Sequence, residues 1–254
     1  MARLRMCLLG GFEPRLDETP ATWRLPRKVS GLLAYLATRR GRPSPRAGLG
    51  AMLWGGSRPE EARHSVRQAL LSTRQALSGA GCADALVAEG DTLALDPAFV
   101  EVDVLEFEDR LDQGTVDALE HAAALYRGEF LDGFRLGEPA FDEWAAGERD
   151  RLRDRARHGL DGLLVHHDDA GAVEPAIETA LRLLRVDRTQ EKVHRTLIKL
   201  YDRIGRRADA IRQYRACVGM LRGELGVEPA PETVRLYREI LRPHTLPRGP
   251  VPEA

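Results

Sequence analysis

Short apolar runs separated by turn residues open the chain. They cover residues 4–9, 12–16 and 22–25, and a polar break lies at residues 17–20. Runs of this length with such breaks are typical of strands joined by tight turns. The pattern therefore predicts a small antiparallel β-sheet at the start of the chain.

Apolar positions then change to helical spacing. In the stretch RKVSGLLAYLATRRG the apolar positions are Val29, Leu32, Leu33, Leu36 and Ala37. This spacing predicts a helix that stops at Gly41. A second helix is expected from Ser44, as its N-cap, to about Trp54. We interpret Trp54 as a core residue beneath the next helix, with a base-stacking platform as the alternative.

The stretch EEARHSVRQALLSTRQAL predicts a third helix, from about Pro59 to Ser78. Proline suits a first helical position, and acidic residues suit the positive end of a helix. At 100° per residue, one face holds Ala62, Val66, Ala69, Thr73 and Leu77. The opposite face holds His64, Gln68, Leu71 and Gln75, and one flank holds Arg63, Arg67 and Arg74.

Arginine and glutamine are side chains that read guanine and adenine edges in the DNA major groove. Arg63, Arg67 and Gln68 are therefore candidates for base or phosphate contact, with His64 and Arg74 in support. The alternative is an ordinary charged face in contact with solvent.

Charge is unevenly distributed along a chain whose formal net charge is only −1. Residues 1–82 hold 14 Lys and Arg against 5 Asp and Glu, and the remainder holds 24 against 34. A basic region can meet a polyanion. The asymmetry favours two domains with different partners, the first facing nucleic acid.

After the third helix, ALVAEGDTLALD has two alternating apolar runs around residues 89–91, which predicts a hairpin with an acidic tip. A sheet, three helices and a hairpin follow one another in a winged helix-turn-helix, whose third helix enters the major groove. The fold expected here is therefore α+β.

Three segments carry a resemblance. LPRKVSGLLAYLATRRGRPSPRAGLGAMLW, EEARHSVRQALLSTRQAL and GDTLALDPAFVEVDVLEF together resemble the OmpR-type winged helix of the Streptomyces antibiotic regulatory protein family. The resemblance covers roughly residues 3–112. It implies DNA binding by the third helix and phosphate contacts from Arg27, Lys28 and Arg46.

From residue 113 the pattern is almost entirely helical, and it repeats. Five pairs of positions lie 34 apart: Gly171 and Gly205, Ala176 and Ala210, Ile177 and Ile211, Ala180 and Tyr214, Leu163 and Leu197. Thirty-four residues is the tetratricopeptide period, a pair of antiparallel helices. We expect residues 158–185 and 192–219 to be equivalent helix pairs in an all-α, tetratricopeptide-like domain.

The same region resembles the bacterial transcriptional activator domain, through LYRGEFLDGFRLGEPAFDEWAAGERDRLR and ELGVEPAPETVRLYREIL. The resemblance runs from about residue 113 to 242. It implies dimerisation, effector binding or contact with RNA polymerase, and tandem DNA half-sites occupied by a homodimer. Residues 243–254 are expected to be a proline-rich tail or linker.

The sequence gives little support for catalysis. GxxxxGK[ST], HExxH and GxSxG motifs are absent, and three dispersed cysteines fit a reducing cytoplasm. His166–Asp169 is interpreted as the polar end of a helix, with a metal site as the alternative. No cofactor, metal or membrane span is expected.

Aromatic residues gather at Tyr126, Phe130, Phe134, Phe141 and Trp144. We interpret them as a packing seam between the domains, with a ligand pocket as the alternative. The sequence as a whole predicts a non-enzymatic, cytoplasmic transcriptional regulator, most simply an activator. The rival hypothesis is a helical-repeat scaffold whose winged helix binds protein.

Overall fold

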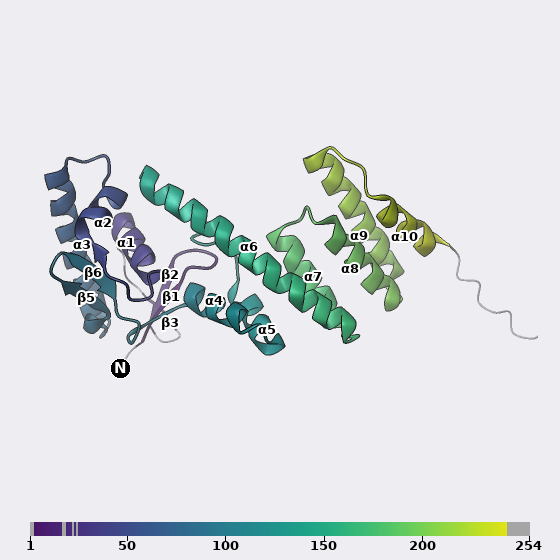
Figure 1. Cartoon of the computed structure of the whole chain (residues 1–254), viewed down its shortest axis with the longest axis horizontal. Helices are drawn as coiled ribbons and strands as arrows, with labels where there is room; N and C mark the ends of the chain where they lie inside the picture. Colours follow the sequence, from purple (N-terminus) through teal and green to yellow (C-terminus); the bar gives the residue numbers. More distant parts are fainter. Residues whose placement is uncertain (1–2, 17–18, 22, 24, 243–254) are drawn as a thin grey trace, which may run out of the picture. The chain divides into compact units, whose positions relative to one another are not determined.

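A computed structural model describes residues 3–16, 19–21, 23 and 25–242 of the chain. The chain divides into two compact units, residues 1–159 and residues 160–254 (Figure 1). The expected tail at residues 243–254 lies outside the described residues. Each unit is described by itself.

A four-stranded sheet contains the beginning of the chain. Its order is β3-β2-β1-β7, with β1 at Leu4–Cys7, β2 at Glu13–Leu16, β3 at Thr19–Pro20 and β7 at Val100–Val102. The strand β1 pairs antiparallel with β2 and parallel with β7. Leu4 and Met6 are fully buried because alternate side chains of β1 face the core.

The antiparallel pairing of β1 and β2 confirms the predicted sheet, but two details were wrong. The described residues of the run expected at 22–25, Trp23 and Leu25, are not in a strand, and β3 lies in the expected break instead. The parallel partner β7 was not predicted. Thr22 and Arg24 lie outside the described residues.

Three helices follow the first strands: α1 at Arg27–Ala37, α2 at Arg46–Leu53 and α3 at Pro59–Gly79. Figure 1 shows them gathered beside the hairpin of β5 and β6. The expectation that Ser44 caps α2 was wrong. Ser44 belongs to β4, Ser44–Pro45, and pairs with Leu93 of β6. The N-cap of α2 is Pro45, and the Ser44 hydroxyl has no hydrogen-bond partner among the described residues.

The predicted hairpin is present. It consists of β5, Leu86–Glu89, and β6, Thr92–Leu95, which pair antiparallel around Gly90 with φ 51°. With β4 it forms a second sheet of order β4-β6-β5, preceded by the short 3-10 helix η1 at Ala83–Ala85. The predicted winged helix-turn-helix is therefore confirmed.

The rest of the first unit is helical. Helices α4, Asp103–Gln113, and α5, Val116–Leu125, meet at Gly114, which adopts φ 65° at the turn. Helix α6, Pro139–Asp169, contributes buried residues between Phe141 and Ala156 to the core that the sheet and α1 share. The division predicted at residue 112/113 falls at the end of α4, within this unit.

The aromatic residues of α6 and the preceding segment pack as a seam. Trp144 lies edge-on to Phe130 and to Tyr35 of α1, with ring centroids 5.6 and 5.1 Å apart. Phe134 lies 5.7 Å from Phe12. These rings therefore join residues 126–144 to elements of the winged helix.

The second unit is a helical array, and no strand occurs among residues 139–242, all of which the structure describes. Its helices are the end of α6, then α7 at Val173–Val186, α8 at Glu191–Arg203, α9 at Arg207–Met220 and α10 at Pro231–Leu241. A π-helical turn, η2 at Leu221–Leu225, follows α9 directly.

Successive turns of this array match at the predicted period. Gly171 and Gly205 have φ 70° and 74°, and their amides donate to the carbonyls of Asp168 and Asp202 at 3.1 and 2.9 Å. Glycine suits a turn at positive φ because it has no Cβ. The same hydrogen-bonded turn thus recurs 34 residues later, as a tetratricopeptide-like arrangement requires.

Small residues lie where the paired helices meet. Ala176 and Ala210 are both fully buried, and Leu163 and Leu197 are buried at equivalent positions on the preceding helices. An alanine lets two backbones approach closely, so its burial at both positions follows from the repeat. The chain therefore has the predicted winged helix followed by an all-α array.

Candidate nucleic-acid interface

Helix α3 presents a polar face to solvent, as its pattern predicts. Its buried residues are Ala62, Val66, Ala69, Leu70, Thr73 and Leu77. Its exposed residues include Arg63, His64, Arg67, Gln68, Leu71, Arg74 and Gln75. The helix begins with a hydrogen bond of 3.3 Å from the Arg58 amide to the Glu61 carboxylate.

The arginines of α3 differ in their partners from the arginines near the middle of α6. On α6, Arg151, Arg153 and Arg155 each pair with a carboxylate. Among the described residues, Arg63, Arg67 and Arg74 form no ion pair, and all three are exposed on one flank of α3. Three uncompensated cations on one helix flank produce a local positive field that attracts an anion.

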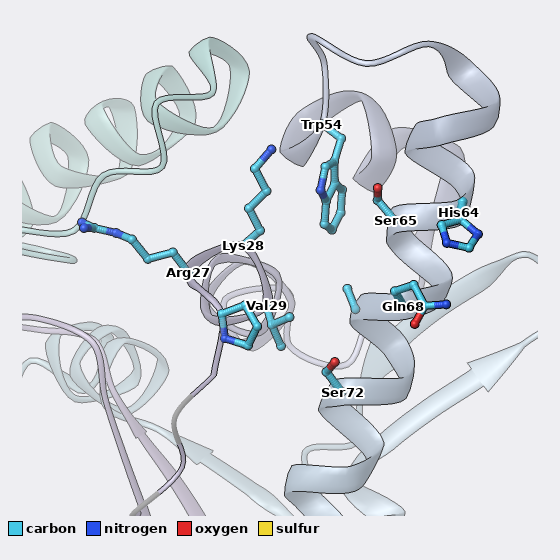
Figure 2. A pocket seen from close by; sticks show the side chains of 10 residues that line it. Arg27, Lys28, Val29, Trp54, His64, Ser65, Gln68 and Ser72 are labelled. Atoms are coloured by element: carbon cyan, nitrogen blue, oxygen red, sulfur yellow. The ribbon is translucent and has the colours of Figure 1, made fainter.

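The other flank of α3 lines a cavity of about 360 Å³ beside the start of α1 (Figure 2). Its lining consists of Pro26, Arg27, Lys28, Val29, Trp54, His64, Ser65, Gln68, Ala69 and Ser72. In Figure 2 the Lys28 side chain runs beside the Trp54 ring, and the Arg27 side chain extends away from the cavity. Of the two α1 cations, Lys28 therefore lies closer to the space between α1 and α3.

The structure thus divides the predicted site residues into three groups. Arg27, Lys28, His64 and Gln68 line the cavity, and Arg63, Arg67 and Arg74 lie on the opposite flank of α3. Arg46 is separate from both. Its amide donates to the Asp91 carbonyl at 2.9 Å, beside the hairpin tip, and its buried Nε atom has no hydrogen-bond partner among the described residues.

Both α1 cations already have partners. The Lys28 ammonium lies 2.5 Å from the Glu138 carboxylate and 5.5 Å from the Trp54 ring centroid. The Arg27 guanidinium lies 5.5 Å from the centroid of the Phe134 ring. An anion that bound Lys28 would therefore compete with an existing ion pair.

Sequence reasoning missed the roles of Trp54 and Glu138 here. Trp54 packs against the core, as the pattern predicts, but it is only half-buried and also lines the cavity. Glu138 precedes Pro139 at the start of α6, and no local signal relates it to a lysine 110 positions earlier.

The tip of the hairpin is exposed and acidic. Glu89 and Asp91 flank Gly90 there, so the tip itself offers no cation to a phosphate. The cations among the predicted site residues lie instead on α3, at the start of α1 and at Arg46, the first residue of α2.

His166–Asp169 forms the polar end of α6. Asp168 pairs with Arg203 at 3.0 Å, and the turn at Gly171 follows. Nowhere in the described part of the chain do three His, Cys, Asp or Glu side chains gather as a metal site would need. None of the described helices combines the length and apolar character of a membrane span.

The fold and its exposed basic helix define a winged helix-turn-helix protein with a helical repeat array. A family model described as the bacterial transcriptional activator domain matches residues 100–241. The chain belongs to this family of transcriptional regulators, with homologues among the Streptomyces antibiotic regulatory proteins. The resemblance inferred from the sequence is thereby confirmed.

Curated relatives match over most of this chain. It is 30% identical to the regulatory protein AfsR of Streptomyces coelicolor over 94% of the chain and 24% of that protein. It is 29% identical to the transcriptional regulator RedD of the same organism, over 84% of the chain and 64% of that protein. The transcriptional regulatory protein MoaR1 of Mycobacterium bovis is 28% identical over 92% of the chain.

The chain therefore spans about a quarter of the first relative and just under two thirds of the second. A solved structure of Mycobacterium tuberculosis EmbR, in complex with a low-affinity phosphopeptide, has the same fold. Its TM-score is 0.66 at 24% identity, and the match covers 95% of this chain and 65% of that one.

Proposed function

We propose that this protein is a sequence-specific DNA-binding transcriptional regulator, and an activator, in which α3 enters the major groove. One observation carries the proposal: Arg63, Arg67 and Arg74 are exposed on α3 and form no ion pair with any residue that the structure describes. In a winged helix-turn-helix, the helix at this position is the one that enters the major groove. Gln68 and His64 lie beside them on the exposed face. The relatives named as transcriptional regulators support the same function.

The proposed roles differ between the two sides of α3. Arg63 and Arg67 would contact bases or phosphates together with Gln68, while His64 and Arg74 support them. Arg27, Lys28 and Arg46 would contact phosphates, which fix the position of the protein but carry no sequence information. The hairpin tip would contribute little, because it is acidic.

We further propose that two copies occupy tandem half-sites about one helical turn, ~10–11 base pairs, apart. A single winged helix reads few base pairs, so a second copy improves discrimination against non-specific sites. Residues 1–112 would act as the DNA-binding domain. Residues 113–242 would act as the activator domain and contact RNA polymerase, with no catalytic role and a cytoplasmic location.

Selection of bound sequences from random duplex DNA tests the function. The purified protein should enrich a motif with two equivalent half-sites, and mobility shifts should show tighter binding to two half-sites than to one. Recovery of no motif, with equally weak retention of every duplex, would contradict sequence-specific binding. It would favour a winged helix that binds protein.

A further inference from the structure

The segment before α6, residues 130–138, contacts both cations at the start of α1, Arg27 and Lys28. Phe134 faces the Arg27 guanidinium, and Glu138 pairs with Lys28. The ion pair is partly shielded, because the side chains of Lys28 and Glu138 are 34% and 16% exposed. These two contacts restrict the residues that the proposed function assigns to DNA phosphates.

This segment is fixed by α6. The Asp142 carboxylate accepts hydrogen bonds from the amides of Leu136 and Gly137, both at 3.0 Å. The Arg149 guanidinium donates to the carbonyls of Phe130 and Phe134 at 2.8 and 3.2 Å. Glu138 is therefore held immediately before the first turn of α6, where its carbonyl accepts a hydrogen bond from the Asp142 amide at 2.9 Å.

The segment also packs closely on α1. A Cβ atom added to Gly31 would lie 2.6 Å from Leu136 Cδ1 and 3.3 Å from the ring of Phe141. A larger residue at this position of α1 would require the end of the Leu136 side chain to shift. This close packing holds Glu138 within reach of Lys28.

The position of Lys28 makes this pairing relevant to DNA. Its side chain lines the same cavity as Ser65 and Ser72 of α3 (Figure 2). A phosphate that approaches Lys28 either displaces the Glu138 carboxylate or shares the ammonium with it and is repelled by its negative charge. The displaced carboxylate would lose its cation while staying largely shielded from water, which is unfavourable.

We propose, on the basis of the proposed function, that Glu138 is an internal competitor for the DNA phosphate at Lys28. Glu138 lies within the residues that match the activator-domain family, whereas Lys28 belongs to the winged helix. The activator-domain segment thus lowers the affinity of the winged helix for DNA. It does so equally for every sequence, since a phosphate contact does not depend on the base.

The substitution Glu138→Gln tests this, because it keeps the shape of the side chain and removes its charge. Affinity for both the selected duplex and an unrelated duplex should rise by about three- to tenfold at low salt, as loss of a competing, partly exposed ion pair would give. The matched control is Asp132→Asn. Asp132 lies exposed on the same segment and forms no ion pair among the described residues.

A double-mutant cycle assigns the effect to Lys28. The gain from Glu138→Gln should disappear in a Lys28→Ala background if the carboxylate acts through that ammonium. A gain equal to that of Asp132→Asn, or one that persists without Lys28, would overturn the proposal. Weaker binding by Glu138→Gln would also overturn it, because Glu138 would then position Lys28 for DNA.

The outcome separates this proposal from the function on which it rests. If the parent binds its selected duplex and Glu138→Gln binds it equally well, only the competition is wrong. If neither the parent nor any variant binds a duplex, DNA binding itself is wrong and the competition falls with it. Thermal unfolding midpoints of all variants establish that each one is folded.

Discussion

The carboxylate of Asp103 accepts a hydrogen bond of 2.8 Å from the backbone amide of Leu8. It also accepts one of 3.0 Å from the amide of Leu9, so one side chain at the start of α4 satisfies two consecutive buried donors just after β1. Asp103 itself is 2% exposed. This contact joins the two ends of the winged helix.

Replacing Asp103 by alanine should destabilise the protein. Two buried amides would lose their acceptor, and each unsatisfied donor costs about 1–3 kcal/mol. Urea unfolding followed by circular dichroism measures the change in the free energy of unfolding. A loss below about 1 kcal/mol would show that water replaces the carboxylate without penalty.

The same residue predicts a dependence on pH. Burial raises the pKa of the Asp103 carboxyl above its ordinary value, outweighing the hydrogen bonds from Leu8 and Leu9 and the charge of Arg127. The folded protein therefore holds this proton at a higher pH than the unfolded chain. The stability it contributes is complete below the ordinary pKa and is lost as the pH rises through the raised pKa.

A comparison of the parent with Asp103→Asn isolates this contribution. As the pH falls from about 7 to about 4, the difference in free energy of unfolding should shift in favour of the parent. The variant has no carboxyl to protonate at this position. A shift in favour of the variant would mean that the folded state holds the ionised form more strongly than the unfolded chain does.

Arginines on α3 and α1 should respond differently to substitution. If Arg67 reads a base, Arg67→Ala should cost ~1–3 kcal/mol of binding and relax the preference at one position. Arg27→Ala should weaken all duplexes alike and flatten the dependence of affinity on salt. Selection experiments and salt titrations measure both effects. Unchanged binding and preference for Arg67→Ala would exclude it as a base reader.

The array should not tolerate a large side chain where its helices cross. Ala210→Trp should destabilise the protein by at least ~1–3 kcal/mol, since Ala210 is fully buried against the preceding helix. Ala176→Trp should act similarly, because Ala176 occupies the equivalent position. Ala216 is exposed on the same helix as Ala210, so Ala216→Trp is the control and should change the urea midpoint little.

Replacing Arg149 by lysine should destabilise the protein. Its guanidinium donates to the carbonyls of Phe130, Leu131 and Phe134, a planar fork that an ammonium cannot reproduce. Arg149→Lys should cost ~1–2 kcal/mol and speed hydrogen exchange in the segment before α6. Arg157→Lys is the control, since Arg157 forms only a partly exposed pair with Asp154 and should be near neutral.

The features predicted correctly from the sequence are those that depend on residues close together in the chain. The buried stripe of α3, the turns at Gly171 and Gly205 and the hairpin around Gly90 all depend on neighbours within a few residues, and the structure has them as expected. Helical periodicity also predicted correctly that Arg63, Arg67 and Arg74 lie outside the buried face of α3. The candidate base-reading face was therefore visible in the sequence, although its roles remain a prediction.

Contacts between distant residues could not be predicted in this way. Ser44 has the composition of a helix cap, but it pairs with Leu93 across a sheet that forms only in the complete fold. Glu138 resembles any other acidic residue before a helix until the structure brings it to Lys28. Such pairings depend on tertiary packing, which overrides the preferences of short segments.

The parallel pairing of β1 with β7 has a consequence for the order of events during synthesis. Leu4 pairs with Val100, and almost a hundred residues must be translated between the two. At ~5–20 residues per second, the first strand waits roughly 5–20 s for this partner. During that interval the edge of β1 that later pairs with β7 has no neighbouring strand and is open to pairing with another nascent chain. A chaperone that shields β1 on the ribosome should therefore raise the yield of folded protein.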